Sequence, residues 1–408
     1  MHHVIIGGSI AGISAAKEIQ RGDVGAKITV VSEEKTRMYY RPMLPFVIEK
    51  DEIDITFVDD PAERFATKNV FEKVTGIDVS SKEVRFSSGT KLGFDKLLIA
   101  TGSGAIIPDI PGLGGDDVFP LRTMENALEI KSSVKGKRSA VVMGGGFVGT
   151  KAAIALKHLG LKVTIIEKME QILPQRLDRR GAGIVSDVMR AAGIEIIVND
   201  SISEIIRDSG AVKSVRLSSG GSRGADMVIV AVGTKPNVEV FKDPGIKFDR
   251  GILINEFLQT NIPDIYAAGD VVEYVDLITG LPSVSALWTN AEEMGRFAGK
   301  NMTGDNIKYR GFLSVMNATD IFNIAVTSAG LIEPEGKGYE IFVQDNINSY
   351  RKLVLKGDSL AGMVFIGDVS NAGIYTNLIK NRIPLGSLKE EAIKGGLEYI
   401  DFVMNAPV

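Results

Sequence analysis

The chain has 408 residues, of which 44% are hydrophobic and 24% are charged. At roughly 100–200 residues per domain, this predicts a globular protein of about two to four domains and excludes a disordered chain. The formal net charge is −4, and no apolar run approaches the roughly 18 residues that span a bilayer. Both features argue against nucleic-acid and membrane partners.

The absence of cysteine is the most restrictive feature of the composition. It excludes a thiolate catalyst, disulfide exchange, and any cysteine-ligated iron–sulfur cluster or zinc site in this chain. The only histidines, His2, His3 and His158, argue against a histidine base or a histidine metal site. We therefore expect no metal and no catalytic side chain, and we assign the chemistry to an organic cofactor.

The N-terminal segment enters an apolar strand, Val4–Ile6, without a basic region or a cleavage site, which predicts a cytoplasmic protein. A glycine-rich turn, a helix over residues 13–19 and a β-branched strand at Ile28–Val31 follow. Candidate nucleotide-binding positions lie in the turn, after the second strand and at the end of a later strand: Gly7, Ser9, Ile10, Ala11, Gly12, Glu33 or Glu34, Ala100, Thr101 and Gly102.

The same order of elements returns later in the chain. Strand Val141–Met143, a glycine turn, a helix over residues 150–159 and strand Val163–Ile166 repeat the first unit at an offset of 137 residues. The corresponding positions are Gly144, Gly146, Phe147, Val148, Gly149, Glu167, Val232 and Gly233. We interpret the repeat as two βαβ nucleotide-binding folds.

Each glycine turn has a physical role in such a fold. Glycine permits the tight turn and lets the backbone approach a pyrophosphate, and the following helix presents its free N–H groups to the phosphate. An acidic residue about 20 positions later accepts hydrogen bonds from a ribose. Ser9 replaces the middle glycine of the first turn, and we expect its small hydroxyl to be tolerated or to donate to the phosphate.

Residues Thr260 to Asp270 end in Ala268-Gly269-Asp270. This segment resembles the FAD-dependent pyridine nucleotide–disulfide oxidoreductase superfamily. The resemblance implies that Asp270 holds the ribityl chain of FAD, that Gly269 belongs to the same FAD site, and that Ala100-Thr101-Gly102 is the return strand to FAD. It also implies that Val232 and Gly233 belong to the NAD unit.

Two further segments narrow the resemblance. Tyr39 to Leu44 resembles the branch of rubredoxin reductases and nitrite reductase flavin domains, which implies that Arg41 lies near the flavin and that Pro42 opens a helix. Ala286 to Ala291 resembles the start of a helix beneath the flavin, with Thr289 or Asn290 as its cap and Trp288 against the flavin. With Met316-Asn317, it also resembles the FAD subunits that accompany tungsten aldehyde oxidoreductases.

The second unit carries the features that select the pyridine nucleotide. Glu167 places a carboxylate where a 2′-phosphate would otherwise bind, which favours NADH over NADPH. Lys168 beside it acts in the opposite direction. Lys151 stands where many relatives carry a glutamate near the nicotinamide.

We therefore predict an α/β fold with two Rossmann-like domains, as in glutathione reductase, and a C-terminal α+β interface domain. The expected boundaries are 1–112 and 245–307 for FAD, 113–244 for NAD(H) and 308–408 for the interface domain. In the last domain we expect strands at Tyr339–Val343, Lys352–Leu355 and Gly362–Ile366. A capping box at Ser387–Glu390 should open a helix with an apolar stripe from Leu388 to Ile400.

The predicted function is an FAD-dependent NADH oxidoreductase that passes electrons to rubredoxin, a ferredoxin or an iron–sulfur partner subunit. One alternative is an NADH oxidase, which without cysteine should form hydrogen peroxide. The other is a flavin-bound assembly or signalling protein with slow turnover. The C-terminal domain resembles one that is often used for dimers, so a homodimer through it is a further possibility.

Overall fold

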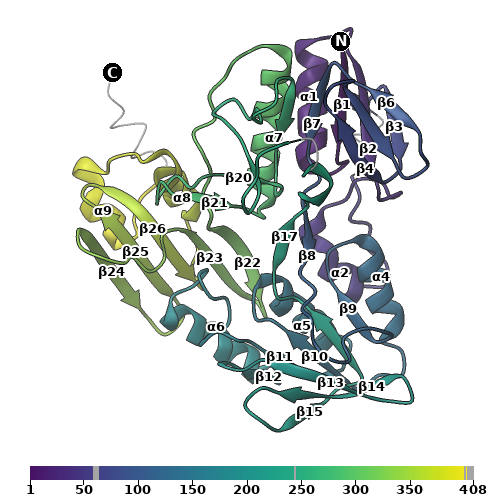
Figure 1. The fold of residues 1–408 in the computed structure, drawn as a ribbon. Coiled ribbons are helices and arrows are strands. Elements are labelled where there is room, and N and C mark those ends of the chain that lie inside the picture. Colours follow the sequence, from purple (N-terminus) through teal and green to yellow (C-terminus); the bar gives the residue numbers. More distant parts are fainter. Residues whose placement is uncertain (58–63, 243–244, 399–400, 402–408) are drawn as a thin grey trace. The chain divides into compact units, whose positions relative to one another are not determined.

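The computed structural model describes residues 1–57, 64–242, 245–398 and 401 (Figure 1). The chain forms two compact units. The first contains Met1–Ile106, Arg122–Glu125 and Thr234–Ser314; the second contains Ile107–Leu121, Asn126–Gly233 and the chain from Val315 onward. Our division into three domains with the boundaries above stays a prediction.

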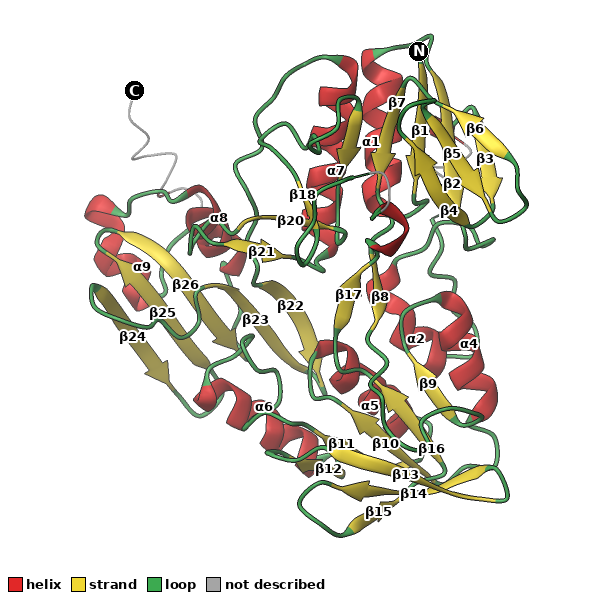
Figure 2. Ribbon diagram, in the orientation of Figure 1, coloured by secondary structure: helices red, strands yellow, loops and turns green. Residues whose placement is uncertain are grey.

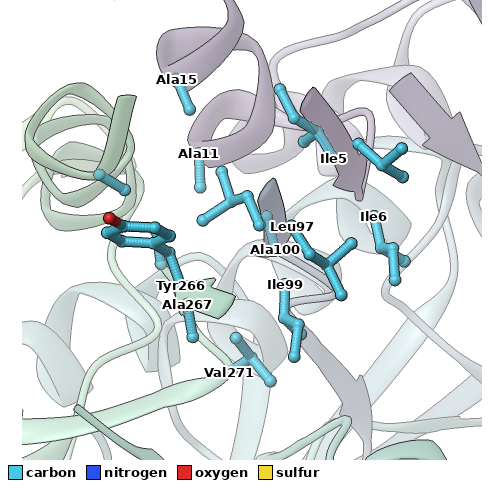
Figure 3. Close-up of a cluster of buried hydrophobic side chains, with 14 of the residues drawn as sticks. Ile5, Ile6, Ala11, Ala15, Leu97, Ile99, Ala100, Tyr266, Ala267 and Val271 are labelled. Atoms are coloured by element: carbon cyan, nitrogen blue, oxygen red, sulfur yellow. The ribbon is translucent and has the colours of Figure 1, made fainter. Parts of the chain in front are cut away.

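The first unit is built on a five-stranded parallel sheet in the order β19-β7-β1-β2-β3. The strands are β19 (Ile265–Ala267), β7 (Lys96–Ile99), β1 (His2–Ile6), β2 (Lys27–Ser32) and β3 (Lys68–Phe71). Central strands are apolar because both faces of a parallel sheet are covered. Figure 3 shows this core, in which Ile5, Leu97 and Ile99 are fully buried.

Helices α1 (Ile10–Gly22) and α7 (Trp288–Thr303) pack closely against each other in this unit. Small residues make the close approach possible. A Cβ at Gly295 would lie 2.1 Å from the carbonyl oxygen of Ala11, and one at Gly299 would lie 2.5 Å from that of Ala15. The helix of the first glycine turn is therefore fixed by backbone contact with α7.

Smaller elements complete the first unit. They are the antiparallel sheet β4 (Val74–Asp78), β5 (Glu83–Phe86) and β6 (Lys91–Gly93); the sheet β18 (Ile252–Leu253), β20 (Val272–Val275) and β21 (Pro282–Val284); the pair β8 (Ser103–Ala105) and β17 (Thr234–Pro236); and η1 (Arg41–Met43), α2 (Leu44–Glu49) and η2 (Glu239–Phe241).

His3 makes the stability of this unit depend on pH. Its ring is fully buried in β1, and among the described residues neither ring nitrogen has a hydrogen-bond partner. Burial, with Lys96 and the N-terminus adding to it, lowers the pKa of His3 from 6.5 to about 4. Between pH 6.5 and about 4, His3 is therefore protonated in the unfolded chain but neutral in the folded chain. The free energy of unfolding falls as the pH drops through this range.

We expect the free energy of unfolding to decrease by about 3 kcal/mol across that range because of His3 alone. His3→Leu should remove about that much of the pH dependence of the free energy of unfolding, measured by urea denaturation at a series of pH values. An equally steep pH dependence in His3→Leu would contradict this account.

The second unit contains a matching parallel sheet in the order β12-β11-β10-β16-β9. Its strands are β12 (Ile194–Ile197), β11 (Lys162–Ile166), β10 (Ser139–Met143), β16 (Met227–Val230) and β9 (Val118–Pro120). Helices α4 (Met124–Ser133), α5 (Phe147–His158) and α6 (Arg179–Ala191) and the antiparallel sheet β13 (Ile202–Asp208), β14 (Ala211–Leu217) and β15 (Ser222–Gly224) accompany it. The predicted repeat of the nucleotide-binding fold is confirmed.

The second unit also contains the C-terminal antiparallel sheet, in the order β22-β23-β26-β25-β24 (Figure 2). Its strands are β22 (Met316–Ile321), β23 (Ile324–Gly330), β26 (Ser359–Ile366), β25 (Tyr350–Lys356) and β24 (Tyr339–Asp345). Phe365 packs edge-on against Tyr375 of α8 (Ala372–Asn381). A Cβ at Gly181 of α6 would lie 3.1 Å from Ile366, so α6 and α8 cover opposite faces of β26.

The predicted α/β fold class with a C-terminal sheet domain is therefore confirmed, but the helix that follows Ser387 is shorter than its apolar stripe suggested. The structure has a 3₁₀ turn, η3 (Gly386–Leu388), and then α9 (Lys389–Lys394). Ser387 lies inside the turn and does not cap α9, so the capping box was wrong. Gly395 adopts a left-handed conformation and ends the helix, and Ile400 lies outside the described residues.

Within the described residues, no helix is both long and apolar enough to cross a membrane. The cytoplasmic location stays a prediction.

Candidate functional site: two glycine turns at parallel sheet edges

The carboxyl ends of β1, β7 and β19 lie at one edge of the first sheet because the three strands are parallel. This edge brings together Gly7, Ala100-Thr101-Gly102 and Gly269-Asp270. A Cβ at Gly7 would lie 2.0 Å from the carbonyl oxygen of Ala100, and one at Gly12 would lie 1.9 Å from that of Gly7. Only glycine fits at these two positions, which sequence reasoning placed in the first dinucleotide turn.

Ser9 is the N-cap of α1, and its side chain makes no capping hydrogen bond. The helix contains the next three predicted residues, Ile10, Ala11 and Gly12. The first N–H groups of any helix lack partners within it and favour an anion. The serine that replaces the middle motif glycine therefore leaves the helix end suited to a phosphate.

A charged network lies beside this edge. Arg122 donates from Nη2 to Asp270 Oδ2 (2.8 Å) and to the hydroxyl oxygen of Ser103 (2.9 Å). Ser103 in turn donates to Asp270 (3.0 Å). Arg41 donates to the carbonyl oxygen of Arg122 (2.6 Å) and to Glu34 (2.7 Å). The predicted Arg41 and Asp270 thus belong to one network, and sequence reasoning missed its link, Arg122, which no motif marks.

In the first unit, no acidic residue occupies the position that corresponds to Glu167 of the second unit. Ile6 pairs with Val31 and Met143 pairs with Ile166, so Ser32 occupies the position that Glu167 takes in the second unit. Glu34 accepts hydrogen bonds from Arg41 and from Tyr39 (2.6 Å). Glu33 is 68% exposed and has Lys73 at 3.6 Å, so its carboxylate is the more accessible of the two to a ligand.

Trp288 is the first residue of α7, and Leu287 precedes it as N-cap without a side-chain hydrogen bond. Thr289 and Asn290 are therefore not caps, contrary to expectation. Asn290 is buried and donates to Ser285 and to the carbonyl oxygen of Leu313. The Trp288 ring lies 5.8 Å from that of Tyr40. Pro42 is the second residue of the 3₁₀ turn η1, after Arg41, so it does not open a helix as expected.

The second sheet repeats this geometry at the ends of β10 and β16. A Cβ at Gly144 would lie 2.4 Å from the carbonyl oxygen of Ala231, and one at Gly149 would lie 2.0 Å from that of Gly144. Gly146 is the N-cap of α5, which begins with Phe147, Val148 and Gly149. Val232 and Gly233 follow β16 at the same edge. All predicted positions of this turn lie together.

Glu167 is buried and holds the turn through both carboxylate oxygens. It accepts hydrogen bonds from the N–H of Gly145 (2.6 Å) and from the N–H of Met169 (2.8 Å). Around this turn Val148, Val232 and Met169 expose large apolar side chains, which is typical of a surface that a ligand covers. Met169, two residues after Glu167, was missed because no motif marks it.

Lys151, which replaces the glutamate of many relatives, donates to the carbonyl oxygen of Asp320 in β22. Its ammonium group is thus directed to the C-terminal sheet.

The residues present fit two dinucleotides. Both turns contain glycines that admit no Cβ, both following helices lack a side-chain cap, and each edge offers a carboxylate with defined donors. This pair of sites defines the class: an oxidoreductase with two dinucleotide-binding folds. The chain belongs to the pyridine nucleotide-disulphide oxidoreductase family, whose model matches residues 1–295.

A second model, the C-terminal domain of rubredoxin NAD+ reductases, matches residues 316–383. The chain is 33% identical to the NADH-rubredoxin oxidoreductase of Clostridium acetobutylicum over 372 residues, 90% of this chain and 91% of that protein. It is 33% identical to an NADH oxidase of Methanocaldococcus jannaschii over 356 residues, 84% of this chain and 77% of the relative.

The solved structure of the NADH:rubredoxin oxidoreductase from Clostridium acetobutylicum matches with a TM-score of 0.75 and 30% identity, covering 93% of this chain and 94% of that one. The predicted enzyme class, an FAD-dependent NAD(P)H oxidoreductase, is confirmed by these relatives.

Proposed function

We propose that this protein oxidises NADH through FAD and delivers the electrons to a separate redox protein such as rubredoxin, a ferredoxin or an iron–sulfur subunit. The observation that carries the proposal is the duplicated glycine turn. One copy lies beside the Arg122–Asp270 network and suits FAD, and the other is closed by Glu167 and suits NADH. Bound FAD supplies the chemistry, because a flavin accepts hydride and releases electrons.

The chain's own residues bind and orient the two nucleotides. The N-terminal ends of α1 and α5, after Ser9 and Gly146, would bind the pyrophosphates, and Asp270 and Arg41 would hold the flavin. Glu167 prefers the ribose hydroxyls of NADH, because a carboxylate repels the 2′-phosphate of NADPH. With no cysteine in the chain, no dithiol takes the electrons, so the acceptor is external.

The test is anaerobic stopped-flow of the purified protein, first with NADH and then with NADPH, followed by air or rubredoxin. We expect rapid flavin bleaching by NADH, slow reoxidation by air and fast reoxidation by the carrier. Relatives named NADH oxidase favour a second candidate, which fast reoxidation by air with peroxide formation would support. Very slow bleaching would favour the assembly or signalling role, and a colourless protein would refute the proposal.

We also propose a homodimer through the C-terminal sheet. Its edge strand β24 exposes Ile341 and Val343. If two copies paired antiparallel about Phe342, Ile341 of one copy would lie opposite Val343 of the other. Val343→Lys should then shift the mass measured by light scattering from dimer to monomer, and a wild-type monomer would refute the dimer.

A further inference from the structure

A buried polar cluster joins the second nucleotide-binding fold to the C-terminal sheet. Asp178 accepts hydrogen bonds from Tyr350 (2.5 Å) and Lys352 (3.1 Å), both on β25. It also accepts one from the N–H of Gly181 (3.1 Å) and so caps α6. The three side chains are 6%, 2% and 7% exposed for Asp178, Tyr350 and Lys352 respectively.

Such a cluster needs a reason, because burying an ion pair costs desolvation and adds little net stability. Asp178 Oδ2 is shared by both β25 donors, and burial together with the carboxylate raises the pKa of Tyr350, so the phenol stays a donor. A cluster with these fixed partners therefore sets the position of Asp178 relative to β25, and adds little to the stability of the fold.

Asp178 is the last residue of a segment that begins at Glu167, the carboxylate of the proposed NADH site. Inside this segment Ile172 and Leu173 are fully buried, and the N–H of Leu173 donates to the carbonyl oxygen of Gly145 (2.8 Å). Gly145 in turn donates its N–H to Glu167. The segment therefore clamps the middle of the glycine turn, with Glu167 at one end and Asp178 at the other.

We propose that Asp178, Tyr350 and Lys352 are positioning residues for the NADH site, through which the C-terminal sheet holds the segment Glu167–Asp178 in its binding conformation. The inference rests on the proposed function only in taking this turn as the NADH site. Its consequence is thermodynamic linkage. A ligand bound at the turn stabilises the C-terminal sheet, and a change that loosens the sheet lowers the affinity for the ligand by the same factor.

The test uses ADP-ribose, which carries the adenosine ribose and the pyrophosphate without the nicotinamide. In the flavin-loaded full chain, Tyr350→Phe and Lys352→Met should raise the calorimetric Kd for ADP-ribose by about five- to tenfold. The KM for NADH should rise in proportion while kcat stays the same. ADP-ribose should also slow hydrogen exchange of β25 and β26 in the wild type, and less so in the variants.

Arg180→Met is the matched control. Arg180 also links α6 to the C-terminal sheet, through Asp345 (2.6 and 3.0 Å), but this pair is exposed. We expect less than a twofold change in Kd, because exposed pairs contribute little.

Three outcomes would overturn the inference: an unchanged Kd in a folded Tyr350→Phe protein, the same loss in Arg180→Met, or a change in kcat alone. If the wild type binds neither ADP-ribose nor NADH, the proposed function fails instead. Should Lys352→Met not fold, Tyr350→Phe decides, since it removes a single oxygen.

Discussion

Asp270→Ala is expected to yield a folded protein that has lost most of its FAD. The carboxylate lies at the carboxyl edge of the first sheet and is held by Arg122 and Ser103. Without it, Arg122 loses its anionic partner in a half-buried site, and the flavin loses its expected ribityl acceptor. A hydrogen bond to a charged group contributes about 1.5–3 kcal/mol, which corresponds to a roughly ten- to hundredfold higher Kd for FAD.

The measurement is the ratio of flavin to protein absorbance after purification, followed by titration of FAD into apoprotein. Asp270→Asn should lose less, since the amide keeps an oxygen for Arg122. Asp264→Asn is the matched control, because Asp264 precedes the same strand at its opposite end and pairs with the exposed Lys82 (2.7 Å). Full flavin content in Asp270→Ala would show that the Arg122–Asp270 network does not contribute to FAD binding.

Glu167→Gln and Glu167→Ala are expected to weaken NADH binding with no loss of FAD. Both oxygens of the buried carboxylate accept backbone N–H groups, from Gly145 and Met169, and an amide can serve only one of them as acceptor. Alanine serves neither and leaves the N–H of Gly145 unpaired. We expect Kd for NADH to rise about tenfold in Glu167→Gln and about a hundredfold in Glu167→Ala.

The expected preference for NADH over NADPH should shrink in both variants, because the repulsion of the 2′-phosphate disappears with the charge. Rapid-reaction bleaching with each nucleotide measures both effects, and the flavin spectrum shows that the first unit is intact. Glu170→Gln is the control, since Glu170 is exposed and pairs with Arg179. Unchanged discrimination in Glu167→Ala would assign the selectivity to other residues.

The repeated architecture could be predicted because its signals are local. A glycine turn between an apolar strand and an alanine-rich helix can be recognised within a short stretch of sequence. Both copies appear in the structure with the same close approaches, Gly7 to Ala100 and Gly144 to Ala231. The C-terminal strands could be predicted for the same reason, since a short apolar run bounded by turn residues indicates a strand.

Local patterns failed where a boundary depends on one competing residue. The stripe after Leu388 continues at helical spacing, but Gly395 ends α9 because a left-handed residue stops the helix. Leu287, with no capping side chain, is the N-cap of α7, although Thr289 and Asn290 are better cap formers.

The sequence by itself thus determined the fold class, the two dinucleotide turns and the absence of a thiol. Only the tertiary structure decided which charges meet at those turns. Arg122 and Asp270 are 148 positions apart, and Asp178 and Tyr350 are 172 apart. Such pairs leave no periodicity or spacing in the chain, because their contact arises only when the sheet order brings distant strand ends and helix ends to the same place.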